Sequence, residues 1–90
     1  MMVKTILYHP KFVAEFRGLD AILQERAIKI EKLFHSNPLH PSLRLHPLKG
    51  RLKGSWSISV TMKVRIIFMR LEDGSVVFFS IGHHDIYRAW

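Results

Sequence analysis

The sequence predicts an α+β fold, in which a helical hairpin packs on one face of a small antiparallel sheet in the order β-α-α-β-β-β. Three observations predict it. Apolar residues recur at helical spacing from residue 22 to 34. Apolar and polar residues alternate from 55 to 62, as in a strand with one buried face. The run Glu72-Asp73-Gly74-Ser75 is typical of a hairpin turn, because Asp-Gly readily supplies positive φ. Ninety residues without repeat or linker predict one domain, 1–90.

The first half of the chain is predicted to hold one strand and the two helices. Val3 to Tyr8 mixes β-branched and aromatic residues, which favours a short strand. Pro10 suits the first turn of a helix, and Gly18 breaks that helix. Asp20 can cap a second helix, which ends at Asn37-Pro38 because the residue before proline is pushed out of the helical region.

The second half is predicted to be a loop followed by strands. Residues 37–47 contain three prolines and are expected to lead from a loop into an edge strand. In the next strand Trp56, Ile58, Val60 and Met62 would face the core, and the alternating serines would face away. Strands at 64–68 and 76–81 flank the hairpin turn, and a polar tail begins at Gly82. One face of this sheet is expected to stay open and to carry basic side chains.

Charge is the strongest global feature of the composition. Fourteen Lys and Arg against seven Asp and Glu give a net charge of +7, and no acidic residue occurs between Glu31 and Glu72. Such asymmetry favours a polyanion or an acidic protein as partner, although a solvated basic surface has the same signature. The chain has no cysteine, no secretory signal at its start and no apolar run long enough to span a bilayer. We therefore expect a cytoplasmic protein without membrane contact.

Six histidines suggest either metal binding or proton transfer. Their spacing argues against a metal, because His83 and His84 are adjacent and would point opposite ways in an extended chain, and no His-x-x-His pattern occurs. We expect no metal, no other cofactor and no small-molecule ligand. RNA carries its own nucleophile, the 2′-hydroxyl, so a ribonuclease needs a base, an acid and cations, which histidine, arginine and lysine supply.

Three segments, taken in order, resemble the RelE/ParE superfamily of bacterial toxins. The run Leu45-His46-Pro47-Leu48-Lys49-Gly50 followed by Leu52-Lys53-Gly54-Ser55-Trp56-Ser57 is similar to its "H/E-P-L-x-G" and "L-x-G-x-W-S" segments. Val64 to Phe68 resembles its "R-(I/L)-(I/V)-(Y/F)" strand, and Ile81 to Tyr87 resembles its "G-H-x-x-x-(V/I)-Y" ending. The resemblance covers essentially the whole chain and is nearest to the YoeB and YafQ branches.

This resemblance implies a role for each candidate catalytic residue. His46 falls where those toxins carry the general base, and Arg65 falls on the arginine that contacts the phosphate. His83 falls on the C-terminal general acid, although a slip of one residue would give that role to His84. Tyr87 matches a tail tyrosine that some members need.

The sequence departs from the YafQ pattern at two places. Ser59 and Lys63 stand on the middle strands where YafQ-like toxins carry further His and Asp residues. A YafQ site therefore cannot be present unchanged.

The resulting hypothesis is the toxin of a type II toxin–antitoxin system, a metal-independent endoribonuclease that acts on mRNA, in the ribosomal A site as the resemblance implies. Its partner would be an acidic antitoxin. The residues expected to bind RNA are Lys49, Arg51, Lys53, Lys63 and His84. Two alternatives stay open: a ParE-like toxin that inhibits DNA gyrase without nuclease activity, and an inactive RNA- or protein-binding module on the same scaffold.

Overall fold

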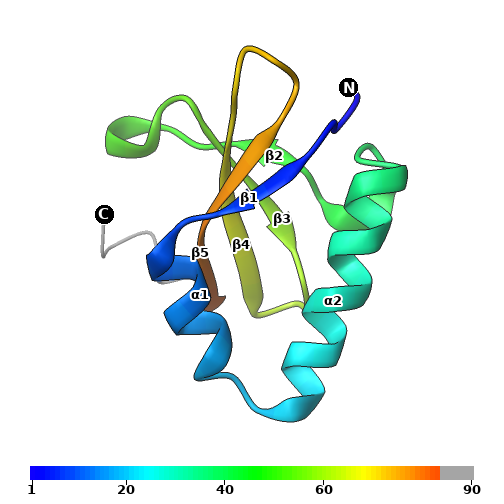
Figure 1. The fold of residues 1–90 in the computed structure, drawn as a ribbon, viewed down its shortest axis with the longest axis vertical. Helices are drawn as coiled ribbons and strands as arrows, with labels where there is room; N and C mark the ends of the chain where they lie inside the picture. The colour runs from blue at the N-terminus through cyan, green and yellow to red at the C-terminus, as the bar shows by residue number, and fades with distance from the viewer. Residues whose placement is uncertain (84–90) are drawn as a thin grey trace.

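Two helices lie over one face of a five-stranded sheet in the structure, a computed structural model that describes residues 1–83 (Figure 1). This arrangement confirms the predicted α+β fold and its helical hairpin. The elements in chain order are β1 (Ile6–Tyr8), α1 (Pro10–Arg17), α2 (Ala21–Ser36), the 3-10 turn η1 (Pro41–Leu43), β2 (His46–Pro47), the 3-10 turn η2 (Gly50–Leu52), β3 (Ser55–Ser59), β4 (Val64–Arg70) and β5 (Val76–His83).

The sheet has the strand order β1-β5-β4-β3-β2 and is mixed rather than purely antiparallel. The strands β2 to β5 are antiparallel neighbours, but β1 pairs in parallel with β5, with Ile6 opposite Val76 and Tyr8 opposite Phe78. The prediction of an antiparallel sheet is therefore wrong for β1. Hairpin turns fix the direction of neighbouring strands, whereas β1 reaches its partner only through long-range packing, which no local pattern encodes.

Both helices begin and end close to the predicted signals. The Nδ1 atom of His9 accepts from the backbone N–H of Lys11 at 3.1 Å and caps α1, with Pro10 in the first turn. The Asp20 carboxylate accepts from the N–H of Leu23 at 2.8 Å and caps α2. The helix α2 ends at Asn37, as Pro38 predicts.

An aromatic cluster joins the helices to the sheet. The ring of Phe34 on α2 lies 4.9 Å from that of Phe68 on β4 and 5.8 Å from that of Phe78 on β5, measured between centroids. On α1, the ring of Phe12 lies 5.4 Å from that of Phe78. Phe34, Phe68 and Phe78 are fully buried. Burial of these large rings provides the main driving force for packing the hairpin on this face.

The opposite face of the sheet is less open than predicted. Ser57 is 0% exposed and Ile67 is 1% exposed, although both belong to the row that faces away from the helices. The alternation of apolar and polar residues in β3 correctly predicted which residues share a face. It did not predict that the face away from the helices would also be buried at its centre. The strand β3 also ends earlier than predicted, because Val60 N–H and Thr61 N–H donate to the Val64 carbonyl and close a turn there.

Candidate active site

His46 and Arg65 lie on the same face of the sheet, away from the helices. His46 on β2 pairs with Ser57 on β3, and Arg65 on β4 pairs with Ser59. Ser57 and Ser59 are two residues apart on one strand, so they and their directly opposite partners share a face. Strand spacing puts the two Cα atoms about 12 Å apart, which leaves room for a phosphodiester between the two side chains.

The ring of His46 is held in one tautomer. Its Nδ1 atom lies 3.1 Å from the carbonyl oxygen of Arg44. A carbonyl oxygen can only accept, so Nδ1 donates in this contact, and in the neutral form of the ring the free lone pair lies on Nε2. Arg44 itself has a φ of 48°, the one positive φ at a non-glycine residue in the described part of the chain. This left-handed residue caps the 3-10 turn η1, where its N–H donates to the Pro41 carbonyl at 3.2 Å.

Arg65 and its cross-strand neighbour Ser59 both carry a buried polar atom without a partner. Within residues 1–83 the Arg65 Nη1 and the Ser59 Oγ are the buried side-chain atoms that make no hydrogen bond. An unsatisfied buried donor carries a desolvation cost of about 1–3 kcal/mol. A guanidinium binds anionic oxygens well, which makes Arg65 a candidate phosphate-binding residue.

His83 does not lie in the row of Arg65. It is exposed at the end of β5 and pairs with Val64, whereas the residue opposite Arg65 is Gly82. Val64 belongs to the core beneath the helices, so the register assigns His83 to the face opposite that of Arg65. His83 therefore lies one residue beyond the position opposite Arg65 in the register of the sheet, and its role as general acid stays a prediction. His84 and Tyr87 lie outside the described residues.

Four expected RNA-binding cations are exposed in the two loops on either side of β3. Arg51 lies in η2, between β2 and β3, with Lys49 and Lys53 next to it in sequence, and Lys63 lies in the turn before β4. Gly50 and Gly54 bracket η2 with φ values of 66° and 96°, which other residues rarely adopt. None of the four forms an ion pair within the part of the chain that is described. Their charges therefore remain available to a polyanion.

Comparison with solved structures decides the fold. The chain superposes on a YoeB/ParE toxin from Agrobacterium tumefaciens with a TM-score of 0.74 and 16% identity, covering 90% of this chain and 99% of that one. It superposes on YafQ from E. coli strain BL21(DE3) with a TM-score of 0.73 and 21% identity, covering 93% and 97%. The chain has the RelE/ParE toxin fold.

Other neighbours with the RelE/ParE fold are recorded as complexes. They include DinJ–YafQ from E. coli, with a TM-score of 0.71 and 22% identity over 92% of this chain and 96% of that one. They also include the RelBE2 toxin–antitoxin complex from Mycobacterium tuberculosis, with a TM-score of 0.64 and 18% identity over 93% and 94%. No protein-family model and no curated protein matches the sequence.

On this RelE/ParE scaffold, sequence reasoning missed two features near the candidate site. It did not pair Ser59 with Arg65, because that pairing depends on the register between β3 and β4. It also missed Glu15, an acidic residue on α1 whose side chain reaches the edge of β5. The resemblance marked Ser59 only as a departure from the YafQ pattern, and no motif in the sequence marked Glu15.

Two further findings describe what residues 1–83 do not contain. No group of three or more His, Asp or Glu side chains there is arranged to hold a metal ion. No helix in this part of the chain has both the length and the apolar character needed to cross a bilayer.

Proposed function

We propose that this chain is the toxin of a type II toxin–antitoxin pair and a metal-independent endoribonuclease that cleaves mRNA. The observation that carries the proposal is that Arg65 and His46 lie on the same face of the sheet. Arg65 is half-buried, and its Nη1 has no hydrogen-bond partner in the described structure. The similarity in fold to YafQ and YoeB toxins supports the same class of protein.

The proposed chemistry uses the nucleophile that RNA supplies. His46 Nε2 removes the proton from the 2′-hydroxyl, whose oxygen attacks the adjacent phosphorus, and Arg65 stabilises the extra negative charge on the phosphate. A histidine at the end of β5 protonates the departing 5′-oxygen, which leaves a 2′,3′-cyclic phosphate and a 5′-hydroxyl. His83 is the residue that the resemblance assigns to this step, and a slip of one residue in that alignment would assign it to His84.

The proposed partners follow from charge and from the neighbours. A net charge of +7 and the four exposed cations around η2 and before β4 favour mRNA, in the setting of the ribosome, as substrate. An acidic antitoxin would neutralise the same charge, and two structural neighbours were solved as DinJ–YafQ and RelBE2 complexes.

The test is primer extension on translated mRNA in cells that express the chain or its variants. Arg65→Ala is expected to lower cleavage by about 100-fold or more, since loss of one transition-state donor typically costs that much. Arg70→Ala is the matched control, because Arg70 is an exposed arginine at the far end of β4. His46→Gln should abolish the cuts, and comparison of His83→Gln with His84→Gln identifies the acid.

Three outcomes contradict the proposal. Growth arrest with inhibited gyrase and no mRNA cuts would identify a ParE-like toxin. RNA binding without cuts or growth arrest would identify an inactive binding module. Equal cleavage by the Arg65→Ala and Arg70→Ala variants would remove Arg65 from the chemistry.

A further inference from the structure

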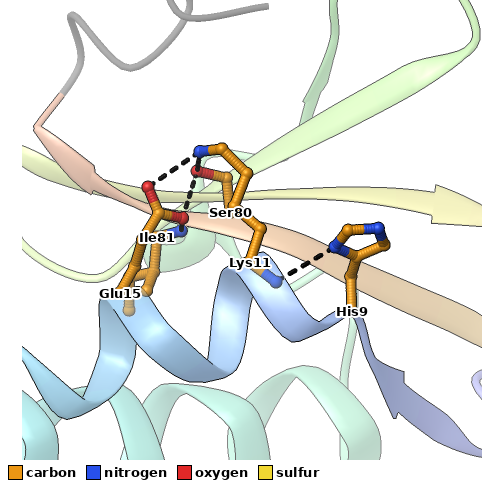
Figure 2. A network of polar contacts seen from close by, with 5 residues as sticks. All are labelled: His9, Lys11, Glu15, Ser80 and Ile81. Atoms are coloured by element: carbon orange, nitrogen blue, oxygen red, sulfur yellow. Dashed lines mark hydrogen bonds and ion pairs between the residues drawn. The ribbon is translucent and has the colours of Figure 1, made fainter.

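The outer edge of β5 loses its strand partner halfway along its length. The strand β1 ends at Tyr8, opposite Phe78, and the last backbone bond across this edge is donated by His9 N–H to the Phe78 carbonyl at 2.9 Å. Beyond that point α1 lies along β5, and the Glu15 side chain of α1 contacts the edge of the strand (Figure 2). The N–H of Ile81 donates to Glu15 Oε1 at 3.3 Å, so a carboxylate stands where a neighbouring strand would offer a carbonyl.

Two more side chains close a network around this carboxylate. The hydroxyl of Ser80, which is fully buried, donates to Glu15 Oε1 at 2.7 Å. The Lys11 ammonium donates to Glu15 Oε2 at 2.8 Å and to Ser80 Oγ at 3.2 Å (Figure 2). The side chains of Lys11 and Glu15 are only 35% and 29% exposed, and charge-assisted bonds in such a setting are stronger than those in water.

The network lies next to a β-bulge in β5. The register between β4 and β5 shifts between Ile67 and Phe68, which leaves Phe79 as an extra residue immediately before Ser80. A bulge of this kind bends a strand and re-aims the residues that follow it. The re-aimed segment contains Gly82, the residue opposite Arg65, and then His83.

We propose that Glu15, together with Lys11 and Ser80, positions the end of β5 against Arg65 and so sets the geometry of the candidate ribonuclease site. Glu15 acts through the strand and does not touch RNA. The inference rests on the proposed function for its effect on cleavage, although the positioning of the strand can be measured without it. Misplacement of a reacting group by about 1 Å can lower a rate by about 100-fold, so a loose strand end would lower the rate strongly.

The first test is the kinetics of RNA cleavage by the full chain, at a temperature where all variants are folded. Glu15→Ala is expected to lower kcat by about 10- to 100-fold with KM within twofold, and Glu15→Gln, which keeps an acceptor but loses the charge, should lie between it and the native chain. Glu25→Ala, at an exposed glutamate on α2, is the matched control and should be unchanged. An unchanged kcat in Glu15→Ala, or a rise in KM alone, would overturn the proposal.

The second test is amide hydrogen exchange, which needs no activity. In Glu15→Ala the amides of Ile81, Gly82 and His83 are expected to exchange about 10-fold faster or more, while the Ile58 amide on β3 keeps its rate. A uniform acceleration across β3 and β5 would show that Glu15 only stabilises the whole fold, and would refute positioning. If the native chain cleaves no RNA, the proposed function fails, and the exchange pattern still decides whether Glu15 holds the end of β5.

Discussion

Arg65 and Ser59 face each other across β3 and β4, and each carries a buried polar atom that residues 1–83 leave without a hydrogen bond. Natural structures satisfy nearly all such atoms, because an unpaired buried polar group loses its water and gains nothing in return. The two residues therefore hold unpaired polar atoms at a cost in stability, which makes them candidates for binding a ligand.

A substitution at Ser59 tests this interpretation. Ser59→Ala removes a buried hydroxyl without a partner, so the free energy of unfolding in urea is expected to rise by up to about 1 kcal/mol. Ser80→Ala is the matched control, because the Ser80 hydroxyl donates to Glu15 at 2.7 Å, and its loss should lower that free energy by about 1 kcal/mol. A loss of stability in Ser59→Ala as large as in Ser80→Ala would show that Ser59 is satisfied after all.

At the scale of elements, the β4–β5 hairpin is held by its turn. The Asp73 carboxylate accepts from the N–H of Ser75 at 2.9 Å and from its hydroxyl at 3.2 Å, and Gly74 has a φ of 92°. These bonds, the one from the backbone N–H first, lower the pKa of Asp73 below its ordinary value of 3.8. The Asp-Gly pair therefore acts in the structure as the sequence predicts.

The lowered pKa makes the stability of the turn depend on pH. Because the carboxylate is favoured in the folded state, its contribution is complete above the unfolded value of 3.8 and is lost as the pH falls through the lower folded value. The midpoint of urea unfolding should thus fall between pH 6 and pH 2.5 by more in the native chain than in Asp73→Asn. Parallel pH profiles for the two proteins would contradict this assignment.

At the scale of the whole molecule, a net charge of +7 combines with a cluster of exposed cations around η2. Binding of single-stranded RNA should release counterions, with a slope of about −0.7 per phosphate contacted in a plot of log affinity against log salt. Contact with about four phosphates would lower the affinity roughly 50-fold between 50 and 200 mM salt. Fluorescence anisotropy with a labelled RNA measures this slope.

One variant pair locates that binding surface. Lys49→Ala is expected to reduce the magnitude of the salt slope by about 0.7, the contribution of one phosphate contact. Lys29→Ala, at an exposed lysine on α2, should leave the slope unchanged. Equal effects would mean that charge attracts RNA over the whole surface, with no preference for the sheet face.

The sequence by itself determined most elements of this protein and the residues that are candidates for its chemistry. The helical period placed α2 between Asp20 and Asn37, alternation assigned Ile58 and Ser57 to opposite faces, and Asp73-Gly74 located the hairpin. These features depend on residues a few positions apart, whose spacing directly encodes geometry. Motif spacing also selected His46 and Arg65, whose catalytic roles stay predictions.

Only the tertiary structure decided how distant segments meet. It put β1 in parallel on the edge of β5, paired Arg65 with Ser59 and Gly82 rather than with His83, and brought Glu15 to the strand end. A shift of one residue in a strand register exchanges its two faces, and that register is chosen by packing of the whole core. For that reason candidate residues could be selected from the chain, while their arrangement in space could not.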